Sequence, residues 1–124
     1  MTSLALQAEI DRAVRESLQR HTSRVESEMA RQFTLWGEQN HPDGIGPHYE
    51  GDANWFRWVT EKATTNKTLT WADIFLEEVY EAMAEDDDAK FEEEIVQVEA
   101  VLRSWIAARA RRKIKERAEK ALDN

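Results

Sequence analysis

Apolar residues recur at intervals of three, four and seven positions along the first 36 residues of the chain, without an interrupting glycine or proline. This spacing places them on one face of a helix. We therefore expect one long amphipathic helix from Leu4 to Trp36. Its apolar seam is formed by Val14, Leu18, Val25, Met29, Phe33 and Trp36.

A sharp break follows this helix, because the segment 37–47 holds three of the four glycines and both prolines. Beyond it the pattern predicts a shorter helix from about Asn54 to Thr64 and a loop at 65–68. Thr70 is placed to cap the next helix, with Asp73 in its first turn. That helix ends near three consecutive aspartates at 86–88, where the last helix begins.

The composition supports an all-helical fold. The chain of 124 residues is 41% hydrophobic and has only four glycines and two prolines, which leaves little material for hairpin turns. We expect an all-α four-helix bundle with long first and last helices, forming one domain over residues 1–124 with a charged helical tail at about 109–124. Such long helices exceed the core that one chain supplies, which favours a homodimer or homotetramer.

Charge and cysteine content exclude several classes of protein. The formal charge is −8, which disfavours a nucleic-acid partner and suits a protein that collects cations. The absence of cysteine excludes disulfides and thiolate metal sites. No apolar run approaches the roughly 20 residues that span a bilayer, and no apolar signal core begins the chain. We expect a cytoplasmic protein without a membrane partner.

Three glutamates fall where helical periodicity predicts buried side chains. Glu94 is flanked on its helix face by Val101 and Trp105, each within about 20°. On the preceding helix, Glu78 shares a face with apolar residues, and Glu81 lies at the edge of that face. An unpaired buried carboxylate costs several kcal/mol, so such groups are normally paired, protonated or bound to a metal ion.

The short connection between these two helices allows them to run antiparallel. Glu78, Glu81, Glu94 and Gln97 then lie near the same end of a helical hairpin and present four oxygen donors. Oxygen ligands of this kind suit Mg²⁺ or Mn²⁺, and Mg²⁺ also takes phosphate oxygens as ligands. A phosphate-bearing substrate is therefore expected.

This pattern resembles the ExxE…ExxD signature of the MazG-like, all-α nucleoside triphosphate pyrophosphohydrolases. Glu78 and Glu81 match the first pair, and Glu94 matches the first residue of the second, within a stretch of about 71–107. The resemblance implies a bundle of that family's type, which hydrolyses a nucleoside or deoxynucleoside triphosphate to the monophosphate and pyrophosphate with Mg²⁺. It makes Glu78, Glu81 and Glu94 metal ligands and catalytic residues.

The fourth position of the signature is aspartate in the family and Gln97 here, which supplies a neutral oxygen to the metal. A catalytically degenerate member, acting as an interaction or nucleotide-binding protein, is therefore the alternative. For an active site the resemblance implies metal-assisted attack of water at the α-phosphorus. Glu81 or Glu78 would take the proton.

Residues outside the four-oxygen group are candidates for holding the substrate. The segment 36–44 resembles a Trp/Gln/His segment that precedes the glutamate helix in some MazG-like proteins, which makes Trp36, Gln39 and His41 candidates for base contacts. Lys62 and Lys67 lead into the glutamate helix and are candidates for contacts to the outer phosphates, although most such lysines are solvated.

Two other interpretations of the helical pattern compete with this one. A ferritin-like di-iron site requires Glu-x-x-His pairs, and no histidine of this chain stands three residues after a glutamate. A helical interaction protein, whose glutamates merely meet arginines, is the main rival. The basic run 109–117 contains Glu116 and is followed by Glu119, so a solvated helix end or subunit interface is favoured there over a nucleic-acid site.

Overall fold

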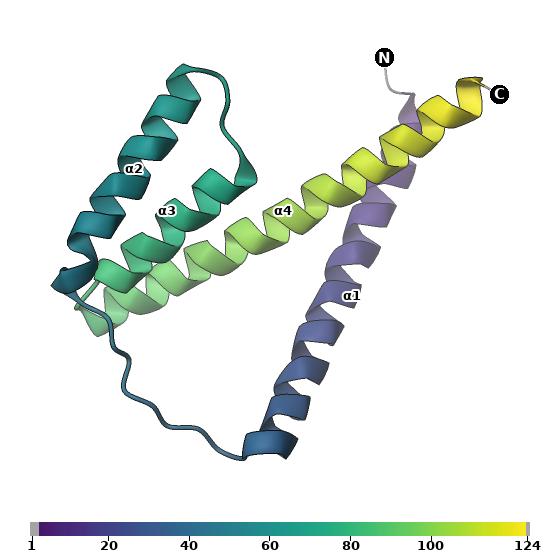
Figure 1. The fold of residues 1–124 in the computed structure, drawn as a ribbon. Coiled ribbons are helices and arrows are strands. Elements are labelled where there is room, and N and C mark those ends of the chain that lie inside the picture. The colour runs from purple at the N-terminus through teal and green to yellow at the C-terminus, as the bar shows by residue number, and fades with distance from the viewer. Residues whose placement is uncertain (1–2, 124) are drawn as a thin grey trace. The chain divides into compact units, whose positions relative to one another are not determined.

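The computed structural model describes residues 3–123, and within that range every element of regular secondary structure is a helix (Figure 1). It contains the α-helices α1 (Leu4–Trp36), α2 (Glu50–Thr65), α3 (Trp71–Ala84) and α4 (Asp88–Asp123), and a 3-10 turn, η1 (Pro47–Tyr49). The all-α class and the long first and last helices are confirmed. The MazG-like type of bundle stays a prediction.

The chain divides into two compact units. Unit 1 comprises residues 1–41 and 103–124, and unit 2 comprises residues 42–102. Helix α4 contributes to both, with residues 88–102 in unit 2 and residues 103–123 in unit 1. A single domain over residues 1–124, with a charged tail at its end, stays a prediction.

In unit 1, α1 runs antiparallel to the C-terminal part of α4 (Figure 1). Ser3 caps the start of α1, because its hydroxyl accepts a hydrogen bond from the Leu6 amide at 3.1 Å. It ends at Gly37, which adopts a left-handed φ of 66° and donates its amide to the Phe33 carbonyl at 2.7 Å. A side-chain bond links the two helices, because Arg103 donates to the Thr22 hydroxyl at 2.7 Å.

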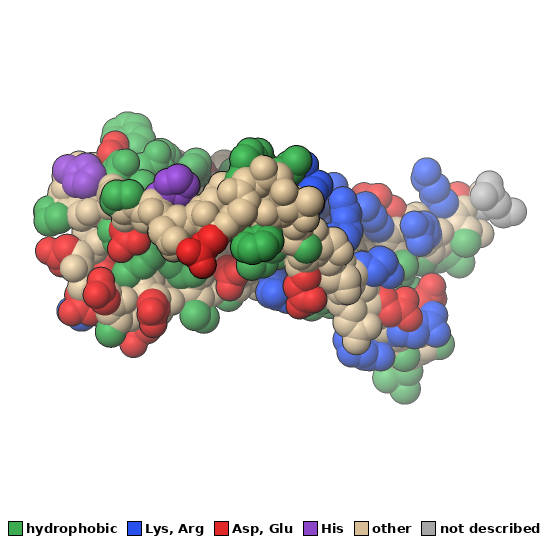
Figure 2. Space-filling model, turned by 90° about the horizontal axis from the view of Figure 1, so that it is seen from below, with side chains coloured by type: hydrophobic (Ala, Val, Ile, Leu, Met, Phe, Trp, Pro, Cys, Tyr) green, Lys and Arg blue, Asp and Glu red, His purple; other side chains and the backbone are tan. Residues whose placement is uncertain are grey.

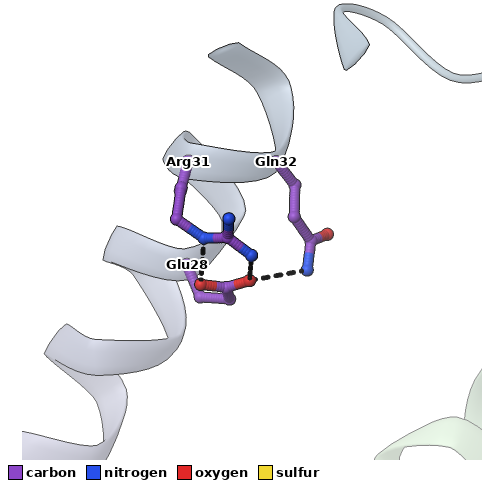
Figure 3. A network of polar contacts seen from close by, with 3 residues as sticks. All are labelled: Glu28, Arg31 and Gln32. Atoms are coloured by element: carbon purple, nitrogen blue, oxygen red, sulfur yellow. Dashed lines mark hydrogen bonds and ion pairs between the residues drawn. The ribbon is translucent and has the colours of Figure 1, made fainter. Parts of the chain in front are cut away.

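The second half of α1 is exposed from residue 23 onward. Its apolar stripe stays uncovered, with Met29 63%, Phe33 64% and Trp36 60% exposed. On the same stretch, Arg31 donates two hydrogen bonds to the Glu28 carboxylate and Gln32 donates a third (Figure 3). These bonds, with Arg31 contributing most, lower the pKa of Glu28 to about 2.

In unit 2, α3 begins with a capping box. Thr70 accepts a hydrogen bond from the Asp73 amide, and the Asp73 carboxylate accepts one from the Thr70 amide. The expected cap therefore forms. One of the predicted aspartates also caps α4, because Asp87 accepts a hydrogen bond from the Lys90 amide at 2.9 Å.

Helices α2 and α3 pack against each other. The rings of Phe56 and Tyr80 stack with their centroids 4.7 Å apart, and the Thr60 hydroxyl donates to the Asp73 carbonyl at 3.3 Å. Ala53 on α2 and Ala82 on α3 are buried. Helix α2 begins at Glu50, four residues earlier than predicted, because it continues directly from η1 without an intervening loop.

Within residues 3–123, none of the helices combines the length and apolar character that crossing a membrane requires.

Candidate metal centre

The candidate site lies in unit 2 and is built by α3 and the first turns of α4. Glu78 and Glu81 are three residues apart on α3, so their side chains share one face of that helix. Glu94 comes from the second turn of α4. Only residues 85–87 join the two helices, and the caps at Thr70 and Asp87 define where each helix starts. Local sequence thus positions both halves of the site.

The three glutamates converge. Each offers one carboxylate oxygen, and these oxygens lie within 4.8 Å of one another. All three side chains are half-buried, whereas Glu92 and Glu93 on the same turn of α4 are exposed. The expectation that Glu78, Glu81 and Glu94 come together is therefore met in the structure.

Two oxygens of this cluster have no hydrogen-bond partner among the described residues. Oε2 of Glu78 and Oε2 of Glu94 are both buried and accept no hydrogen bond from the described residues. A carboxylate oxygen in this state loses its hydration without compensation. Unpaired carboxylate oxygens of this kind are suitable ligands for a cation.

The electrostatics of the cluster follow from this arrangement. Burial raises the pKa of Glu78, and the charges of Glu81, Glu94 and Glu77 raise it further. Burial also raises the pKa of Glu94, with contributions from Glu81, Glu85 and Glu93. Both carboxyls therefore favour the protonated form more than an ordinary glutamate does, and a bound cation would reverse that preference.

Arg57 is a residue of this site that the sequence analysis did not identify. From α2 its Nη2 donates to Oε1 of Glu81 at 3.4 Å, and the two side chains are 46% and 24% exposed. A second bond, from Nη1 of Arg57 to Asn54, holds the guanidinium in place. Arg57 precedes Glu81 by 24 residues, so only the packing of α2 on α3 reveals the pair.

Gln97, the fourth predicted ligand, is on α4 one turn after Glu94 and is exposed. Its role as a ligand stays a prediction. Its exposure contrasts with the half-buried state of the three glutamates, so Gln97 meets water more freely than they do.

The predicted substrate-binding residues lie in different parts of the chain. Trp36, Gln39 and His41 belong to unit 1 and are exposed. Lys62 is on α2, with Nζ 5.8 Å from the ring centroid of Trp58. Lys67 follows α2 in a turn, with a left-handed φ of 59°.

Comparisons with known proteins add no relative. No model of a protein family matches the chain, and no curated protein or solved structure is similar to it. The geometry of the glutamate cluster, together with its resemblance to the MazG-like signature, is therefore the basis for assigning a function.

Proposed function

We propose that this chain is a metal-dependent nucleoside triphosphate pyrophosphohydrolase, which cleaves a nucleoside or deoxynucleoside triphosphate to the monophosphate and pyrophosphate. The observation that carries the proposal is the convergence of Glu78, Glu81 and Glu94 with two buried carboxylate oxygens that have no partner. The spacing of these glutamates in the MazG-like pattern supports the choice of reaction.

The donor set fits a hard divalent cation. Three carboxylates offer oxygen ligands only, and their clustered negative charge is unfavourable unless a cation or protons neutralise it. Mg²⁺, with Mn²⁺ as a substitute, matches these ligands, and Gln97 would complete the set through its amide oxygen. When bound, the ion would neutralise charge developing on the phosphates and acidify the attacking water.

The protein's own residues have separate tasks in this reaction. A water oxygen bonds to the α-phosphorus while the bond from that phosphorus to the bridging α,β oxygen breaks, and pyrophosphate leaves with that oxygen. A proton of the water passes to a carboxylate, for which Glu81 and Glu78 are the candidates. Arg57 donates to the Glu81 carboxylate from the α2 side and partly neutralises its charge.

A second function is favoured by two observations, namely the exposed Gln97 and the Arg57 guanidinium beside Glu81. Gln97 is neutral where the MazG-like signature has an aspartate, and Arg57 partly neutralises Glu81, so less negative charge is available to a metal. A catalytically degenerate protein of the same class, which binds nucleotide or another protein without hydrolysis, would show both features.

A panel of nucleoside and deoxynucleoside triphosphates, assayed for pyrophosphate with Mg²⁺ or Mn²⁺, separates the two. We expect metal-dependent release from at least one substrate, and a loss of about 100-fold or more in Glu94→Gln. Glu93→Gln removes the same charge from an exposed neighbour and should retain activity. No release across the panel, with Mg²⁺ and nucleotide still stabilising the protein, would establish the degenerate function.

The proposal includes a homodimer or homotetramer in the cytoplasm, with no nucleic-acid partner. The uncovered stripe on α1 supports self-association, because Met29, Phe33 and Trp36 expose more than half of their surface. A second copy with the same stripe would bury it.

A further inference from the structure

Charge is divided unequally between the two units. Unit 2 contains 16 acidic and four basic residues, whereas unit 1 contains nine acidic and 13 basic residues. Unit 1 thus has a net charge of +4 in a chain whose total is −8. Figure 2 shows the contrast, with Lys and Arg side chains in blue gathered over unit 1 and red Asp and Glu side chains predominating over unit 2. Unit 1 is therefore basic, although the chain as a whole is acidic.

Part of this basic charge lines a cleft in unit 1, between α1 and the C-terminal part of α4. The cleft has a volume of about 540 Å³, within the range of small-ligand sites. Its lining includes two acidic side chains, Glu9 and Glu16, and six cationic ones: Arg12, Arg20, Arg24, Arg109, Lys113 and Arg117. The cleft residues therefore have an excess of four positive charges.

Among the described residues, none of these six cations forms an ion pair. The ion pairs among the described residues join Arg31 to Glu28, Arg57 to Glu81 and Arg112 to Glu116, and none of them involves a cation of the cleft. Only Arg20 has a hydrogen bond, which it donates to the Ser17 hydroxyl at 3.1 Å. The guanidinium and ammonium donors of the cleft are thus available to an anion.

The placement of the charges is unfavourable without an anion. Arg109, Lys113 and Arg117 follow one another at four-residue intervals, so three like charges stand in one row on α4. The helix dipole favours cations in the last turn, where Lys120 lies, but these three residues precede that turn. The dipole therefore does not account for the row.

The walls of the cleft also suit an anion. Ala13, Ile106, Ala110 and Ile114 contribute apolar surface between the charged side chains, and Ala110 is only 9% exposed. Apolar surroundings strengthen the attraction between a guanidinium and a phosphate. Arginine binds phosphate oxygens in pairs through its planar fork of donors, and five of the six cations are arginine.

We propose that this cleft binds an oligophosphate, meaning a chain of two or more phosphate groups, either as an inorganic ion or as the tail of a nucleotide. Its volume and the two acidic residues in its lining favour such a compact anion over a nucleic-acid duplex. The proposal concerns residues other than the glutamate cluster, and it stands whether or not that cluster hydrolyses nucleotides.

The test is calorimetric titration of the whole protein with inorganic tripolyphosphate in the absence of divalent cations. We expect saturable binding that weakens about tenfold in the double variant Lys113→Gln/Arg117→Gln. The matched control is Arg111→Gln/Arg112→Gln, which removes two charges from the same helix outside the cleft and should change the dissociation constant less than threefold. Circular dichroism confirms that both variants keep their helices.

A nucleoside triphosphate and a single-stranded oligonucleotide serve as competitors and distinguish the sources. Stronger competition by the nucleoside triphosphate than by tripolyphosphate identifies a nucleotide ligand, and the reverse identifies an inorganic one. Equal weakening in the two double variants, or no saturable binding, would overturn the proposal. So would an oligonucleotide that binds far more tightly than either and is equally sensitive to the cleft variant. Repeating the titration in Glu94→Gln, with unchanged affinity expected, keeps the result separate from the proposed hydrolysis.

Discussion

At the scale of single residues, the central feature is the contrast between the paired and the unpaired carboxylates of the glutamate cluster. Glu81 has Arg57 as a partner, whereas Glu78 and Glu94 each keep one buried oxygen without a hydrogen bond. Packing of α2 supplies a cation to one side of the cluster only. The cluster is therefore partly neutralised by the protein and partly left for a ligand.

Arg57 should compete with a metal ion for Glu81. We expect Arg57→Gln to tighten Mg²⁺ binding by about two- to fivefold, the range that a partly exposed ion pair allows. Calorimetric titration with Mg²⁺ measures this change. Lys62→Gln removes an equal charge from the same helix and serves as the control. Weaker Mg²⁺ binding in Arg57→Gln would instead show that Arg57 chiefly orients the carboxylate.

The raised pKa values of Glu78 and Glu94 make the stability of the metal-free protein depend on pH. Between the ordinary carboxyl pKa of 4.5 and the raised values, the folded state binds more protons than the unfolded state. The free energy of unfolding contributed by these groups is therefore greatest below that window and falls as pH rises through it.

The double variant Glu78→Gln/Glu94→Gln isolates this effect from all other titrating groups. In urea denaturation with a chelator, we expect the variant to gain stability relative to the natural chain as pH rises from 4.5 to about 8, by about 1 kcal/mol or more. A difference that stays constant over this range would contradict the assignment.

At the scale of elements, the features encoded by neighbouring residues were predictable. The bounds of α1 and the Thr70 cap with Asp73 follow from the spacing of residues within one or two turns. The early start of α2 was missed, because the aromatic residues from Trp55 onward gave the signal and Glu50 to Asp52 have no apolar side chain. The Arg57–Glu81 pair and the charged cleft depend on contacts between elements, which spacing along the chain does not specify.

The capping box at the start of α3 should contribute measurably to stability. Thr70→Ala removes the side chain that accepts the Asp73 amide, and we expect a loss of about 1 kcal/mol in the free energy of unfolding. Urea denaturation measures the loss. Thr65→Ala provides the comparison, since the Thr65 hydroxyl only donates to a carbonyl within its own helix. Equal losses in both variants would contradict a specific role for the cap.

At the scale of the whole molecule, the exposed apolar stripe on α1 bears on assembly. We expect Met29→Glu/Phe33→Glu to dissociate the proposed oligomer to single chains, because the charges would be buried in the subunit interface. Light scattering gives the mass. Ser27→Glu/Thr34→Glu adds equal charge to the opposite side of the helix and should leave the mass unchanged. A natural chain that is already monomeric would refute the proposed oligomer.

One long-range hydrogen bond makes the attachment of the segment between α1 and η1 measurable by amide exchange. The buried amide of Gly46 donates to the Met83 carbonyl near the end of α3 at 2.8 Å, whereas the amides of residues 38–45 form no bond to the backbone of the described residues. Hydrogen–deuterium exchange should therefore be fast from residue 38 to residue 45 and slow at Gly46. Because that bond joins the segment to the end of α3, the exchange rate at Gly46 would measure how often the segment detaches from the helix that bears Glu78 and Glu81.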